Sequence, residues 1–222
     1  IESDGQNVIQ TAYHILVASS PELLEQGKGD IWDSGKIESD ASQWIAYQGK
    51  TLKRNAPYYW KVKIDTNKGT TDWSTPAFWT TGLFNEADWQ GQWIGLDKAA
   101  PGDSETQWSR LAARYLRKEF ALKKEVKRAT VHIAGMGLYE LFINGQRIGN
   151  QVLAPAPTDY RKTLLYNTYD VTSLLQTENA IGVTLGNGRF YTMRQNYKPY
   201  KIPTFGYPKL RLNLIVEYAD GS

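Results

Sequence analysis

The chain of 222 residues contains no cysteine, which excludes disulfide bridges, thiol nucleophiles and zinc–thiolate sites. It also lacks a run of apolar residues near the length of about 18 that a membrane-spanning helix requires. Histidine is nearly absent, with two residues. His14 and His132 lie in separate strand patterns without a second ligand at metal spacing, so we interpret them as packed or exposed residues rather than metal ligands or general bases.

An excess of charge of one sign is lacking too. Lys and Arg total 26 and Asp and Glu total 23, which gives a formal net charge of +3 at pH 7. The densest basic run, ALKKEVKR at residues 121–128, contains Glu125 and is interpreted as a solvated connection. Binding to nucleic acid or to an anionic membrane requires a massed basic patch. We therefore expect no nucleic-acid partner and no membrane partner.

Aromatic residues and strand patterns are abundant by contrast. Trp, Tyr and Phe make up 13% of the chain, which predicts aromatic-rich cores. Bulky residues alternate in segments bounded by Gly, Asn, Asp or Pro, as half-buried strands do. The segments are TAYHILVASS, APYYWKVKIDT, PAFWTTG, YLRKEFAL, RATVHIAG, LYELFINGQRIG, NAIGVTLG and LRLNLIVEYADGS. One short helix is expected near residues 21–26, between Pro21 and Gly27, and the predicted class is all-β.

Two domains are predicted from the break between two sets of strands. The segment TTGLFNEADWQGQWIG separates them, and we place the domains at residues 1–84 and 85–222. In the second domain, Asn144 and Gly145 both tolerate positive φ and predict a two-residue hairpin turn. Asp220-Gly221 carries the same turn signal, but the chain stops where the return strand should start. We therefore interpret the second domain as truncated at its C-terminus and the chain as a fragment.

Two long stretches resemble parts of one known family. GLYELFINGQRIGNQVLAPAPTDYRKTLLYNTYDVTSLLQTENAIGVTLGNGRFY, residues 137–191, resembles the amino-terminal β-sandwich domain of bacterial α-L-rhamnosidases of glycoside hydrolase family 78. YHILVASSPELLEQGKGDIWDSGKIESD and YYWKVKIDTNKGTTDWSTPAFWTTGL resemble the fibronectin-III-like module that precedes that domain. The resemblance implies two tandem β-sandwiches, fibronectin-III-like and then larger and jelly-roll-like, in a periplasmic or secreted protein.

The resemblance also implies a function. In that family a later (α/α)6 barrel carries the acidic residues that hydrolyse terminal α-L-rhamnosyl linkages with inversion. Such a barrel would follow Ser222, so we expect this chain to be non-catalytic, to brace the barrel and to shape substrate access. Two alternative functions stay open. In the first, the chain would be a carbohydrate-binding module for rhamnose or flanking sugars. In the second, it would be an adhesion or receptor fragment that shares only the fold.

The residues themselves predict no catalytic site. Glycosidases need two carboxyl groups about 5 to 10 Å apart across the sugar, usually from different elements. Asp30 and Asp33 in DIWDSG are interpreted instead as turn residues that bind nearby backbone amides. No serine has a nucleophile-elbow setting, and GMG at residues 135–137 is not followed by a helical pattern. We predict no catalytic residue and no resident metal in this chain.

Two aromatic and polar loops of the second domain carry the candidate binding residues. They are APAPTDY at residues 154–160 and GNGRFYTMRQNYKPY at residues 186–200. Aromatic rings cover the C–H faces of sugars, while Arg, Asn and Asp pair with hydroxyl groups. Calcium is an alternative ligand, but Asp159 with Asn187 supplies too few oxygens to predict a site. The candidate substrate-binding residues are Asp159, Tyr160, Asn187, Arg189, Tyr191 and Arg194.

Overall fold

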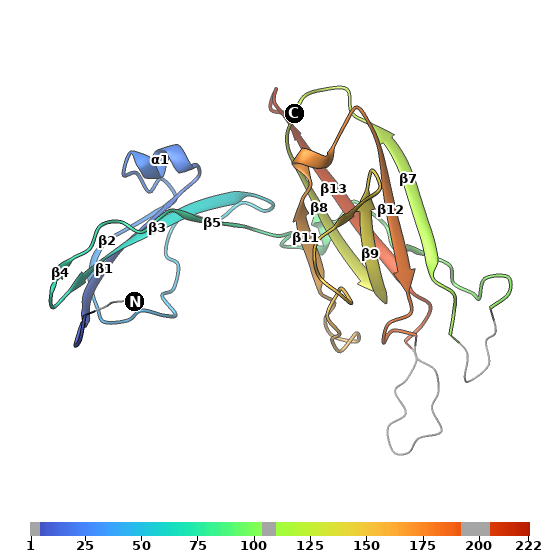
Figure 1. Cartoon of the computed structure of the whole chain (residues 1–222), viewed down its shortest axis with the longest axis horizontal. Helices are drawn as coiled ribbons and strands as arrows, with labels where there is room; N and C mark the ends of the chain where they lie inside the picture. Colours follow the sequence, from blue (N-terminus) through green and yellow to red (C-terminus); the bar gives the residue numbers. More distant parts are fainter. Residues whose placement is uncertain (1–4, 104–109, 192–204) are drawn as a thin grey trace, which may run out of the picture. The chain divides into compact units, whose positions relative to one another are not determined.

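The computed structural model describes residues 5–103, 110–191 and 205–222 and is dominated by antiparallel strands (Figure 1). The prediction of an all-β chain is confirmed. The chain divides into two compact units, residues 1–84 and 85–222. Within the described ranges, no helix is long and apolar enough to cross a membrane.

The first unit is built on one five-stranded antiparallel sheet in the order β2-β1-β3-β4, with β5 also paired to β3. The predicted short helix is present as α1, and Gly27 follows it with φ of +72°. The strand β2 was not predicted, because the turn-forming residues Asp33, Ser34 and Gly35 lie inside it. The elements are β1 (Gln10–Ala18), α1 (Pro21–Glu25), β2 (Trp32–Glu38), β3 (Pro57–Thr66), β4 (Gly69–Thr70) and β5 (Ala77–Thr80).

Both faces of the first sheet carry apolar side chains. Successive residues of a strand point to opposite faces, so Ile15 and Val17 of β1 share one face and Leu16 lies on the other. On the first of these faces, Ile15 and Val17 pack with Tyr58 of β3. On the other face, Leu16 packs with Leu24 of α1, whose side chain is fully buried. The short helix therefore covers one face of this sheet.

The second unit contains two four-stranded antiparallel sheets, in the orders β10-β9-β12-β7 and β11-β8-β13-β6. Asn144 and Gly145 have φ values of +51° and +83°, which confirms the predicted hairpin turn between β9 and β10. The strands are β6 (Ile94–Gly95), β7 (Arg114–Ala121), β8 (Val126–Met136), β9 (Leu138–Ile143), β10 (Gln146–Ile148), β11 (Tyr166–Asp170), β12 (Glu178–Gly186) and β13 (Lys209–Tyr218), with the short 3-10 helices η1 (Glu86–Asp88) and η2 (Thr172–Leu174).

One core lies between the two sheets of the second unit. Ile133 of β8 and Leu210 of β13 come from one sheet, and Leu141 of β9 and Leu185 of β12 come from the other. All four side chains are at most 2% exposed. Glu140 is exposed, which establishes that the odd-numbered residues of β9 face inward. Packing of two apolar sheet faces makes this unit a closed sandwich.

The segment that opens the second unit is fastened to β13. The Nε of Arg211 donates to the carbonyl of Gly91 at 2.6 Å, and its guanidinium group pairs with Glu86. The same group lies 5.2 Å from the ring centre of Trp89. The Oδ1 of Asn213 accepts from the backbone N–H of Gly91 at 2.8 Å. Residues 86–91 are therefore held against the second sandwich by side chains of its last strand.

Candidate functional site

Two loops meet at one end of the second unit, the one after β10 and the one after β12 (Figure 1). Tyr160 of the first loop packs edge-on against Phe190 of the second, with ring centres 5.3 Å apart. Phe205 lies 5.4 Å from the Tyr160 ring and stacks on Phe190 at 6.0 Å. Burial among these rings raises the pKa of the Tyr160 hydroxyl. We call these three residues the aromatic cluster, and it joins the two predicted loops.

The carboxylate of Asp159 is already paired within its own loop. The Nε of Arg161 donates to Oδ1 of Asp159 at 2.9 Å and Nη2 donates to Oδ2 at 3.1 Å. This pairing and the backbone N–H of Arg161 hold the pKa of the Asp159 carboxyl below its ordinary value. The carbonyl of Asp159 accepts from the N–H groups of Lys162 and Thr163 at 2.8 and 3.0 Å. Asp159 therefore closes a local turn, and a ligand would have to compete with Arg161.

Asn187 also makes an internal contact. Its Nδ2 donates to the carbonyl of Leu111 at 2.8 Å, and its own carbonyl accepts from the N–H of Tyr191 at 3.2 Å. Gly188 adopts φ of +51°, and a Cβ there would lie 2.9 Å from the side chain of Leu138. The turn thus needs a residue without a side chain at Gly188, and it holds Asn187 against the segment before β7.

The other candidates differ in their surroundings. Arg189 is exposed, and Tyr191 is half-buried with its ring stacked on that of Tyr207 at 5.8 Å. Arg194 lies outside the described residues. The structure therefore brings Tyr160 and the 187–191 turn together, while Asp159 and Asn187 are held by internal partners. Whether any of them contacts a sugar stays a prediction.

Asp103, which the sequence did not single out, fixes the segment beside Asn187 with a side chain that is 5% exposed. The carboxylate of Asp103 accepts from the N–H groups of Ala100 and Ala112, both at 2.7 Å, and lies 3.0 Å from the guanidinium of Arg114. Hydrogen bonds from those two backbone amides, with Arg114, lower the pKa of Asp103. Ala100 and Ala112 lie in irregular backbone, within 9 residues of Asp103, so no regular strand or helix spacing predicts this contact.

The loop after β10 exposes apolar side chains. Val152 and Leu153 are 81% and 69% exposed, and Leu165, at the end of the same loop, is 43% exposed. The backbone beneath them is fixed, because the N–H of Tyr139 donates to the carbonyl of Ala154 at 2.8 Å. We call Val152, Leu153 and Leu165 the apolar loop residues. Val152 and Leu153 are neighbours in sequence, so the loop offers adjacent apolar side chains to a protein surface.

The other residues weighed as ligands or bases make structural contacts. Asp33 accepts from the N–H of Gly35 at 2.9 Å, as a turn residue should, and its Oδ1 also lies 2.6 Å from Nε2 of His14. Asp30 instead accepts from the N–H and hydroxyl of Ser19, which lies 11 residues earlier in the chain. His132 is fully buried, with Nδ1 3.0 Å from the hydroxyl of Thr168. Among residues 5–103, 110–191 and 205–222, no group of three or more acidic or histidine residues is placed to hold a metal ion.

These observations define an all-β chain of two antiparallel units whose loops are fixed by their own contacts. Residues 1–85 match the family model described as Rha78A-like, N-terminal immunoglobulin domain, and residues 124–222 match the α-L-rhamnosidase N-terminal domain. Each match corresponds to one of the two units, and together the matches confirm the resemblance in the motifs. The immunoglobulin and fibronectin type III folds share the sandwich architecture, so the expected fibronectin-like module agrees with the first match.

Several proteins that match the whole length of this chain are named α-L-rhamnosidase. A protein named α-L-rhamnosidase from Formosa agariphila is 38% identical over 242 residues, which include 100% of this chain. The solved structure of α-L-rhamnosidase from Dictyoglumus thermophilum superposes on all of this chain with a TM-score of 0.85 and 39% identity. That from Aspergillus terreus does so with a TM-score of 0.84 and 30% identity. This chain spans 25% of the length of each of these three relatives.

Proposed function

We propose that this chain is the non-catalytic, amino-terminal part of an α-L-rhamnosidase and that it braces the catalytic domain. The observation that carries the proposal is the extent of the match, since this chain spans a quarter of its relatives and both of its domain families are described as N-terminal. The parent protein would hydrolyse terminal α-L-rhamnosyl linkages in a separate (α/α)6 barrel. A periplasmic or secreted location belongs to the same proposal.

The apolar loop residues would form the surface that contacts the catalytic domain. Burying exposed aliphatic side chains such as Val152 and Leu153 contributes about 1.5 to 3 kcal/mol for each one that becomes fully covered. The loop is also rigid before it binds. Nη2 of Arg147 donates to the carbonyl of Gln151 at 2.7 Å, and its Nε donates to Glu140 at 3.2 Å. A loop that is already ordered loses little conformational entropy on association.

The test uses the full-length protein with a double substitution, Val152→Lys with Leu153→Lys. We expect the half-life of activity on p-nitrophenyl α-L-rhamnoside at elevated temperature to shorten at least tenfold, and each factor of ten in the inactivation rate corresponds to about 1.4 kcal/mol of activation free energy. The initial kcat at low temperature should change little. Thr177→Lys is the matched control, because Thr177 is exposed and lies in the connection between η2 and β12. Equal half-lives for the double variant, the control and the parent would overturn the bracing role.

A second candidate function is sugar binding by the same end of the second unit. It is favoured by the position of Tyr160 beside the turn that carries Arg189 and Tyr191, since aromatic and guanidinium groups together suit a sugar. Asp159 would take part only after release from Arg161. Arg161→Ala should therefore strengthen rhamnose binding if this function is correct, and should have no such effect if the loop only packs against protein.

Calcium fits these residues poorly. The ion takes six to eight oxygen ligands. Both carboxylate oxygens of Asp159 already accept from Arg161, and the side chain of Asn187 is turned by its contact with Leu111. A calcium ion would have to displace a guanidinium group and reorient an amide. We derive no step of the proposed function from calcium.

A further inference from the structure

The second unit has an open pocket of about 500 Å³ beside the aromatic cluster. Small-molecule sites in proteins are typically hollows of about 300 to 1,000 Å³ with a mostly apolar lining and a few polar groups. The described lining of this pocket has that composition, because it combines aromatic rings and a thioether with one ion pair. The rings belong to Trp93, Phe190, Phe205 and Tyr207, and the thioether belongs to Met136.

The aromatic rings are held in place by their own contacts. Phe190 is 8% exposed and stacks on Phe205, with ring centres 6.0 Å apart and ring planes inclined by 25°. The N–H of Phe205 also donates to the carbonyl of Phe190 at 2.9 Å. Tyr207 stacks on Tyr191 with ring centres 5.8 Å apart. Because these side chains are already ordered, a ligand that contacts them bears little of the entropic cost of fixing their rotamers.

Strand ends and a glycine shape the pocket. Lys209, the first residue of β13, lies opposite Gly95 at the end of β6 and Met136 at the end of β8. Gly206 adopts φ of +140°, which favours glycine. A Cβ at Gly206 would lie 3.5 Å from Cε1 of Phe190. A side chain there would therefore cover part of the Phe190 ring, and glycine leaves that part uncovered.

The charged residues of the rim neutralise each other. The Nζ of Lys209 lies 2.9 Å from Oδ1 of Asp97, and the two side chains are 36% and 72% exposed. The pair carries no net charge, so it favours neither an anion nor a cation. A carboxylate has two oxygens that accept hydrogen bonds, and Lys209 contacts one of them. Asp97 therefore retains the capacity to accept a hydrogen bond from a ligand hydroxyl.

We propose that this pocket binds an uncharged aromatic ring that carries a hydroxyl group. The ring would pack against Trp93 and Phe205 in the offset or edge-on arrangements that aromatic pairs prefer, and its hydroxyl would donate to Asp97. A monosaccharide such as L-rhamnose matches the pocket poorly, because its several hydroxyl groups would meet mainly aromatic rings and a thioether. If the proposed function is correct, the ring belongs to the aglycone of an aryl rhamnoside, and this last step alone rests on that function.

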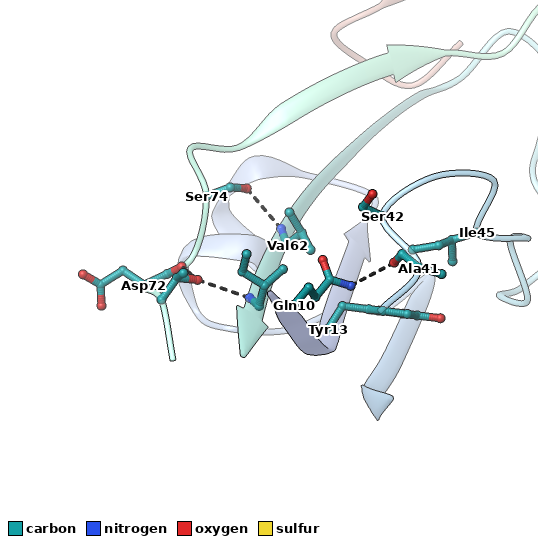
Figure 2. Close-up of a pocket in the computed structure, with 10 residues that line it drawn as sticks. Gln10, Tyr13, Ala41, Ser42, Ile45, Val62, Asp72 and Ser74 are labelled. Atoms are coloured by element: carbon teal, nitrogen blue, oxygen red, sulfur yellow. Dashed lines mark hydrogen bonds between the residues drawn. The ribbon is translucent and has the colours of Figure 1, made fainter. Parts of the chain in front are cut away.

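A depression on the first unit provides a contrast (Figure 2). Its volume is about 420 Å³, and Tyr13 is the one aromatic residue among its described lining residues, beside Ile45, Val62 and Ile64. Figure 2 shows the Asp72 carboxylate pointing away from the other labelled side chains. The described residues of this depression thus do not combine several rings with a carboxylate that faces them, and we expect it not to bind the same ligand.

The methionines of the chain allow a direct test by NMR, because there are two of them, Met136 and Met193. Their methyl groups are isotope-labelled, and Met193→Leu identifies the Met136 signal. We expect 2-naphthol to shift the Met136 signal of the 222-residue chain in a saturable way, because the ring current of an aromatic ligand acts at short range. L-Rhamnose at the same concentration should cause no shift.

Variants separate the ring contact from the hydroxyl contact. Trp93→Ala should weaken the binding of 2-naphthol by about tenfold, since it removes an aromatic wall of the pocket. Asp97→Ala should weaken it by about fivefold and leave the binding of 2-methoxynaphthalene, which has no hydroxyl donor, unchanged. Because Asp97 is exposed, this variant tests the site even if Trp93→Ala does not fold. Tyr13→Ala in the first unit is the matched control and should change neither affinity.

Four results would overturn the proposal. An unchanged Met136 signal up to the solubility limit of 2-naphthol, on folded protein, would mean that the pocket takes no ring. Equal affinities of the parent chain and both pocket variants would place the ring elsewhere. A Met136 shift caused by L-rhamnose would make the pocket a sugar site. Binding to the 222-residue chain but not to the full-length protein would mean that another domain covers the pocket. None of these outcomes bears on the bracing role, which the half-life of the Val152→Lys, Leu153→Lys variant tests.

Discussion

The two units use the same kind of strand and reach different degrees of closure. In the second unit, apolar faces of two sheets meet, and Ile133, Leu141 and Leu185 are at most 1% exposed. In the first unit a single described sheet also carries apolar residues at alternate positions, yet Tyr13 and Ile64 are only half-buried. The difference lies in what covers the face. Alternation in a sequence predicts an apolar face and leaves its cover undetermined.

The largest expected effect contrasts the two cores directly. Leu185→Ala in the second unit should lower the free energy of unfolding of that unit by about 2 to 5 kcal/mol, because the fully buried site leaves a cavity. Ile64→Ala in this 222-residue chain should cost about 1 kcal/mol, since its side chain is already half in water. Denaturant unfolding, monitored by hydrogen exchange in peptides of each unit, measures the loss of unfolding free energy in each unit separately. Equal losses would contradict the assignment of an open face to the first unit.

The second unit should also lose stability in acid through His132. Burial lowers the pKa of His132 to about 4 from its ordinary value of 6.5, so the folded state binds fewer protons than the unfolded state between these values. The stability that depends on the neutral ring is therefore complete above pH 6.5 and falls by about 3 kcal/mol as the pH approaches 4. Urea unfolding of the second unit at pH 7, 5.5 and 4 measures this slope.

His132→Gln gives the control for that experiment. The amide can still pair with the hydroxyl of Thr168 and does not titrate, so the pH dependence between 6.5 and 4 should become flatter even if the variant is less stable throughout. An unchanged slope would show that another group of the second unit is responsible.

A smaller effect concerns the segment that opens the second unit. Arg211→Met removes the hydrogen bonds to the carbonyls of Gly91 and Trp89 and should cost about 2 kcal/mol. Amide exchange of residues 86–91 should accelerate while exchange in the first unit stays unchanged. Lys209→Met is the matched control on the same strand. Its pair with Asp97 is largely solvated, so a loss under about 1 kcal/mol is expected. Equal effects of the two variants would contradict a specific role for Arg211.

Local sequence signals predicted much of the fold. Alternating segments marked most long strands, and Asn144-Gly145 marked its hairpin, because the information for each lies within a few residues. The strands β2 and β11 were missed, as were the two-residue strands β4 and β6. Asp33 and Asp170 are turn formers that here bind local groups while their strands pair with β1 and β8. That pairing depends on partners far along the chain, which a local pattern does not contain.

The candidate site shows the same limit. The sequence placed two polar and aromatic loops in one domain, and the structure joins them through Tyr160 and Phe190. The contact between Asn187 and Leu111 spans 76 residues, and it could not be predicted from spacing. The pairing of Asp159 with Arg161 is local, but it requires the turn that the backbone adopts after Asp159.

The most direct test of the account is a calorimetric titration of the 222-residue chain with L-rhamnose, with and without calcium. Because Asp159 and Asn187 are held by internal partners, the account predicts no saturable heat at sugar concentrations up to tens of millimolar, on protein shown to be folded. Arg161→Ala should behave in the same way. Saturable heat that disappears in the double variant Asp159→Ala, Asn187→Ala would contradict the account and would make this end of the second unit a sugar-binding site.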